Sequence, residues 1–134
     1  RRAFLLAGLA TGGSALTTAH ANNLTTLPRL DWRGVERVAR GQQVYFNAWA
    51  GDEAVNRYIA WAATELRQLH GIELIHVRVN DPAESVARVL AEQQAGRGSD
   101  GSVDLLWING ENFAALRRAN LLYGPWADDV PNAR

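Results

Sequence analysis

Apolar residues recur with two different periods between residues 42 and 122 of this 134-residue chain. Short runs of β-branched, aromatic and other apolar residues predict strands at 44–49, 72–79 and 103–108. After each run, apolar residues return every three or four positions, as they do on one face of a helix. This alternation, with short connections, predicts an α/β fold with a parallel βαβαβα core and right-handed crossovers.

The helix predicted after the first strand has clear signals at both ends. Gly51 closes the strand, Asp52 is placed to cap the helix, and Gly71 ends it. Tyr58 and Trp61 flank the apolar face, where we expect them to pack. The residues expected to face inward are Val55, Ile59, Ala62, Leu66 and Leu69.

The second helix opens with three signals that agree. Asp81 can serve as N-cap, Pro82 suits the first helical position, and Glu84 completes a capping box. Its inward residues are expected to be Val86, Val89 and Leu90. The helix gives way to a glycine-rich stretch at 96–101, which predicts a surface loop.

Almost every residue of the third predicted strand, 103–108, is apolar. Such a run predicts burial on both faces of a parallel sheet, with Trp107 in the core. The segment 109–112 then turns into a third helix that carries Phe113, Leu116 and Leu121. Upstream of the first strand, 22–41 is a largely polar segment in which 31–40 is expected to form a short helix with Trp32, Val35 and Val38.

Residues 1–21 have the layout of an export signal. Arg1 and Arg2 precede an apolar stretch, and Ala19 and Ala21 form an A-x-A cleavage site. The paired arginines resemble the twin-arginine motif. The apolar part is too short and too rich in glycine for a membrane-spanning helix. We therefore expect a periplasmic protein cleaved after Ala21; the alternative is a buried or amphipathic first helix.

Composition excludes several classes of protein. The chain has no Cys, which removes disulfide scaffolds, zinc ribbons, iron–sulfur sites and thiol catalysis. Its 14 basic residues balance 14 acidic ones, which argues against binding to nucleic acid. His20, His70 and His76 form no ligand pattern, and no catalytic motif is present. The G-x-G-x-x-G spacing at 96–101 follows a helix and precedes a strand, the reverse of a dinucleotide site. We expect no catalytic residue, no metal and no cofactor, and so a protein that is not an enzyme.

Candidate chemistry gathers where the predicted strands end. In open α/β sheets, ligands bind beyond the carboxyl ends of the strands. Trp49 could stack on a ring or cover a cation, and carboxylates there could pair with a cation. Asp52 and Asn109 can equally be simple helix caps, as can Asp81 at the end of the second strand, and Trp49 can equally be a packing residue. The candidate ligand-binding residues are Trp49, Gly51, Asp52, Asn109, Gly110, Glu111 and Asn112.

These same segments carry a resemblance to a known family. Residues 44–49 with Gly51 and Asp52 look like the first strand and ligand loop of the family 1 extracellular solute-binding proteins, and residues 103–113 look like their third strand. The resemblance covers 41–132 and is sharpest to a subfamily described as thiamine-transport components. It implies a periplasmic-binding-protein-like (type II) lobe, and it places the residues of the candidate site on the ligand side.

By this resemblance, the chain is the substrate-binding component of an ABC-type importer. Such a protein is a monomer that clamps a small solute between two lobes and delivers it to a permease in the inner membrane. The solute would be thiamine or another organic cation. Residues 42–134 would be the N-terminal part of the first lobe, with the second lobe absent and the chain an N-terminal piece.

Two other functions remain open from the sequence. An exported cofactor-containing enzyme would need a nucleophile, a metal set or a cofactor loop. A ligand-binding sensor domain would need a nearby membrane-spanning or DNA-binding segment. Neighbouring genes for a permease and an ATPase would favour the importer component over both.

Overall fold

A computed structural model describes residues 31–99, 101–125 and 130–131. The export signal predicted at 1–21 and the stretch from 22 to 30 lie outside the described residues. Strands and helices alternate as the sequence predicts, after one short helix at the start. The elements are α1 (Trp32–Ala39), β1 (Gln43–Trp49), α2 (Glu53–His70), β2 (Glu73–Val79), α3 (Pro82–Gln94), β3 (Leu105–Leu106) and α4 (Gly110–Arg118).

The described strands form one parallel sheet in the order β2-β1-β3, so that β1 lies in the centre. β1 pairs with β2 along its whole length, from Gln43 opposite Glu73 to Trp49 opposite Val79. Its pairing with β3 covers only Phe46 and Asn47. The predicted α/β class and parallel strands are confirmed, in a small and open sheet.

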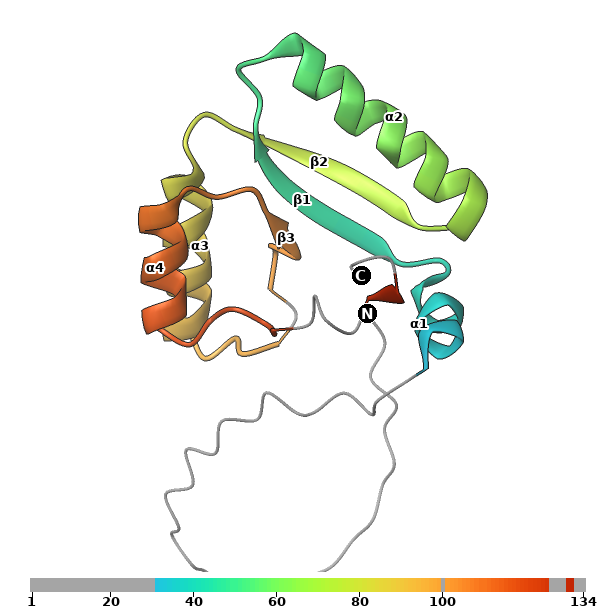
Figure 1. Cartoon of the computed structure of the whole chain (residues 1–134). Coiled ribbons are helices and arrows are strands. Elements are labelled where there is room, and N and C mark those ends of the chain that lie inside the picture. The colour runs from blue at the N-terminus through green and yellow to red at the C-terminus, as the bar shows by residue number, and fades with distance from the viewer. Residues whose placement is uncertain (1–30, 100, 126–129, 132–134) are drawn as a thin grey trace, which may run out of the picture.

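Helices cover the sheet on both sides. Figure 1 shows α2 on one side of the strands and α3 with α4 on the other. Crossovers of one hand produce this arrangement, because the chain leaves β1 toward β2 and then crosses back to β3 on the opposite side. The buried apolar side chains come from both sides of the sheet and are Ala48, Ile59, Val79, Val86 and Leu116.

The predicted helix ends are confirmed. The Asp52 carboxylate accepts from the N–H groups of Ala54 and Val55, and Asp81 and Glu84 form the full capping box. Gly71 ends α2 with φ 67°, in the left-handed region that glycine enters without a steric penalty.

The third strand is shorter than predicted: six residues were expected at 103–108, and only Leu105–Leu106 are in the sheet. Asp104 explains where the pairing begins. Its carboxylate Oδ2 accepts the Tyr45 N–H at 2.8 Å, and its own N–H donates to the Tyr45 carbonyl at 3.2 Å. A side-chain oxygen therefore takes the place of a backbone carbonyl, which ends the regular ladder.

The burial predicted for several apolar residues is wrong. Trp107, expected in the core, is 54% exposed, and Leu105 is 45% exposed, because among the described residues no strand lies outside β3. Leu69, expected on the inner face of α2, is 62% exposed. Leu69 lies in the last turn of α2, next to the helix end at His70.

Three further aromatic or apolar positions also differ from their predicted places. Tyr58 and Trp61 do not pack on the sheet; both are exposed and contact each other, with ring centroids 5.4 Å apart. Leu121 follows α4 instead of belonging to it. In the described part of the chain, no helix is both long and apolar enough to cross a membrane.

Asp104→Ala is expected to weaken the β1–β3 pairing, because the Tyr45 N–H loses its carboxylate acceptor. The measurement is amide hydrogen exchange at Tyr45, which should speed up in this variant. Asp104→Asn keeps an acceptor oxygen at the same place and should stay close to the unmodified protein. Equal exchange in both variants would contradict this role for Asp104.

Glu92 makes stability depend on pH. Hydrogen bonding by Ser102 lowers the pKa of the Glu92 carboxyl: the Ser102 N–H donates to both carboxylate oxygens, at 3.2 and 3.1 Å. A folded-state pKa below the unfolded one stabilises the fold at neutral pH, and this stabilisation is lost as acid protonates the folded carboxyl.

We therefore expect the free energy of unfolding to fall more steeply between about pH 5 and pH 3 in the unmodified protein than in Glu92→Gln. Urea denaturation at each pH measures it. If the free energy of unfolding falls with the same slope in both proteins, Glu92 is not the source of the pH dependence.

Candidate functional site

The predicted site residues lie at the carboxyl ends of two neighbouring strands. Trp49 is the last residue of β1, and Asn109 follows β3 after Trp107 and Ile108. Beyond β1 the chain turns to α2 on one side of the sheet, and beyond β3 it turns to α4 on the other (Figure 1). This reversal between adjacent strands is the topological switch point, where open α/β sheets bind ligands.

Gly51 lies against the indole of Trp49, although Gly51 itself stays exposed. A Cβ placed on Gly51 would overlap three atoms of the six-membered ring of this indole, Cζ2, Cε2 and Cη2. Trp49 nonetheless keeps 48% of its surface exposed. The sequence predicts that Gly51 lets backbone approach a ligand; in the structure the space beside it is taken by Trp49.

The loop between β1 and α2 is tied on both sides. The Ala50 N–H donates to the Val79 carbonyl at 3.2 Å, which extends the ladder with β2 by one residue. The Ala50 carbonyl accepts from Nδ2 of the buried Asn56 at 3.0 Å. Asp52 then caps α2, with its Oδ1 2.7 Å from the Ala54 nitrogen. The residues around Gly51 are therefore held before any ligand arrives.

The second candidate segment forms the start of α4. Asn109 is the N-cap, and its Oδ1 accepts from the Asn112 N–H at 3.3 Å. Gly110 and Glu111 are exposed in the first turn. A Cβ on Gly110 would meet nothing within 4 Å, so here the backbone is open to approach.

The two segments together are acidic. Residues 49–56 and 107–116 contain three carboxylates, from Asp52, Glu53 and Glu111, and no Arg or Lys. The N-terminus of a helix offsets part of this charge at each carboxylate. Arg57 in α2 and Arg117 and Arg118 in α4 come directly after these segments, so the negative charge is confined to the residues nearest the strand ends.

Two buried polar residues behind the site escape sequence reasoning. Asn47 in β1 is fully buried, and its Oδ1 accepts from the Ser85 hydroxyl of α3 at 3.1 Å. Its Nδ2 has no hydrogen-bond partner among the described residues. Asn56 is the second. An Asn inside a strand of apolar and aromatic residues was the available signal for Asn47, since a buried amide needs a partner.

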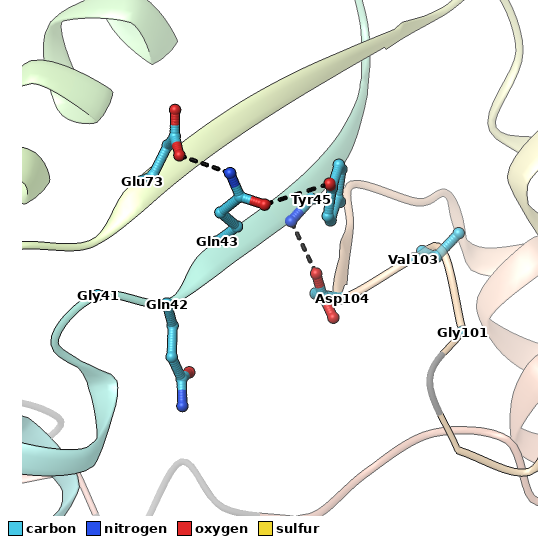
Figure 2. Close-up of a pocket in the computed structure, with 8 residues that line it drawn as sticks. All are labelled: Gly41, Gln42, Gln43, Tyr45, Glu73, Gly101, Val103 and Asp104. Atoms are coloured by element: carbon cyan, nitrogen blue, oxygen red, sulfur yellow. Dashed lines mark hydrogen bonds between the residues drawn. The ribbon is translucent and has the colours of Figure 1, made fainter. Parts of the chain in front are cut away.

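A hollow of about 550 Å³ opens at the other end of the sheet. Figure 2 shows it between the start of β1, the start of β2 and the chain leading to β3. Its polar groups are already paired: Glu73 accepts from Gln43 and from Arg67, and Asp104 accepts from the Tyr45 N–H. Because it lies at the amino ends of the strands, it is separate from the candidate site.

The other residues considered for chemistry remain apart from the switch point. Asp81 caps α3 beyond β2, on the far side of β1 from β3. The Nε2 of His76 lies 3.3 Å from the Ala48 carbonyl within the sheet. No three His, Asp or Glu side chains in the described ranges come together in a way that could hold a metal ion.

Ser85→Ala is expected to lower the free energy of unfolding by about 1–3 kcal/mol, because it leaves the buried Asn47 carbonyl without its donor. Denaturation in urea measures the loss. Ser99→Ala, at an exposed position, should change stability by less than about 0.5 kcal/mol. A loss in Ser85→Ala no larger than in the control would argue against the buried bond.

Comparison with known proteins finds one clear relative. A stretch of 104 residues, 78% of this chain, is 50% identical to Protein YnjB of Escherichia coli (strain K12) and spans 27% of that protein. The chain therefore covers about a quarter of its relative's length. The subfamily that the sequence resembles is the YnjB type, and the relative carries that name; the name itself states no role. No family model matches the chain, and no solved structure matches it significantly.

Proposed function

We propose that this chain is part of the substrate-binding component of an ABC-type importer. In this proposal the protein is exported, captures a small solute in the periplasm and delivers it to a permease in the inner membrane. It binds without catalysis: the ligand is enclosed between this lobe and a second one, and closure makes the form that docks on the permease.

The observation that carries the proposal is the strand order β2-β1-β3. It brings the β1–α2 and β3–α4 connections, which the sequence resemblance assigns to the ligand side, to one switch point. A ligand there would meet groups from two strands, and a second lobe closing over it would complete the enclosure. The 50% identity to Protein YnjB supports the same assignment, since it extends over most of this chain.

The chemistry of the two connections favours an organic cation with a flat ring. Trp49 offers an exposed indole face for stacking or for a cation–π contact. Asp52 and Glu111 supply negative charge on either side of the switch point. Thiamine, which carries a positively charged ring, fits both features and is the first ligand to test.

The test is a thermal-shift screen of the full-length mature protein. The probes are thiamine and its phosphates, polyamines, sugars and metal ions. A ligand that binds only the folded state raises the melting midpoint with its concentration, so thiamine should raise it in a saturable way. A well-folded protein whose midpoint no probe moves would contradict the proposal, and a response to polyamines alone would replace thiamine with them.

Trp49→Ala should weaken thiamine binding by about tenfold, because the ring contact is lost. Titration calorimetry measures the affinity. Trp61→Ala is the matched control, since Trp61 is equally exposed but lies on α2 beside Tyr58. Equal thiamine affinities in the two variants would show that Trp49 packs in the fold and does not contact the ligand.

A further inference from the structure

Two glycines lie in the candidate site, and they differ in what surrounds them. A Cβ on Gly51 would collide with the Trp49 indole, whereas a Cβ on Gly110 would meet open space. Neither residue has a positive φ, so the backbone itself would accept alanine at both positions. The difference between them is therefore steric, and the three atoms nearest to a Cβ on Gly51 all belong to Trp49.

The Trp49 indole is placed against a loop that is itself fixed. The Ala50 N–H donates a hydrogen bond to Val79, and the Ala50 carbonyl accepts one from Asn56. The Asp52 carboxylate accepts a hydrogen bond from the first turn of α2. Pairing of Trp49 with Val79 fixes the backbone from which the indole projects. The backbone that carries the indole and the loop against which the indole lies are therefore both held. One side of the ring meets Gly51, and 48% of the surface of Trp49 stays exposed.

We propose that Gly51 is a positioning residue for ligand binding. Because Gly51 has no side chain, the Trp49 indole can lie against it in the orientation that a planar cationic ligand stacks on. The inference rests on the proposed function, and it assigns Gly51 a role different from ligand approach. Ligand approach to the backbone belongs to Gly110 instead. A pre-placed aromatic ring lowers the entropic cost of binding, because one rotamer is already selected.

The experiment combines a ligand-free readout with a binding measurement on the full-length protein. Tryptophans are labelled with 5-fluorotryptophan, and the Trp49 fluorine resonance is identified by its loss in Trp49→Phe. Gly51→Ala should shift this resonance and leave those of the other tryptophans in place. Gly110→Ala should leave the Trp49 resonance unchanged, because nothing lies near the added methyl group.

Binding is measured with thiamine by titration calorimetry. Gly51→Ala should weaken the affinity by about tenfold, as expected for loss of a cation–π contact. In a Trp49→Ala background, Gly51→Ala should cause no further loss, because a residue that acts through Trp49 has no effect once Trp49 is gone.

Each outcome decides the inference. A Trp49 resonance that does not move in Gly51→Ala overturns it, and so does an affinity loss that persists at full size in the Trp49→Ala background. If the unmodified protein binds no thiamine, that ligand assignment fails while the resonance still decides whether Gly51 seats the ring. If the Gly51→Ala variant unfolds, the double variant Trp49→Ala/Gly51→Ala is measured. Recovery of its melting midpoint supports contact between Gly51 and the indole, and no recovery rejects the proposal.

Discussion

The parallel pairing of β1 with a strand on each side is the constraint from which the candidate site follows. β1 is bonded to β2 over seven residues and to β3 over two, so its end is fixed relative to both neighbours. Crossovers of one hand then send α2 and α4 to opposite sides of the sheet. The switch point between the two connections is a consequence of this order, and every residue proposed to meet a ligand lies at or next to one of them.

The two halves of the candidate site differ in how their polar groups are held. Backbone and side-chain bonds from Val79, Asn56 and Asp52 hold the β1–α2 loop, while Asn109 alone caps the start of α4. One half of the site is thus a fixed aromatic platform, and the other is an exposed helix start with an accessible backbone. Such a division suits a protein that recognises a ring on one side and closes around a charge on the other.

Much of the fold could be predicted because its signals are local. The helix caps at Asp52 and Asp81, the glycine after α2 and the apolar periods depend on neighbours within a few residues, and they appear where the sequence predicts them. The length of β3 could not be predicted, because it depends on Asp104 reaching Tyr45, 59 residues earlier. The exposure of Trp107 likewise depends on which strand lies beside β3, and an apolar run carries no information about that.

The sequence by itself determined the class of fold and the order of its elements. It also marked the segments proposed to meet a ligand, since strand ends and helix starts are marked by local chemistry. Only the tertiary structure decided how those segments are related. It showed that the Trp49 indole lies against Gly51, where a side chain would collide with it, and that Asn47 and Ser85 share a buried hydrogen bond behind the site. None of these residues carries a local sequence signal for its partner. Their roles follow from position in space, which the spacing along the chain does not encode.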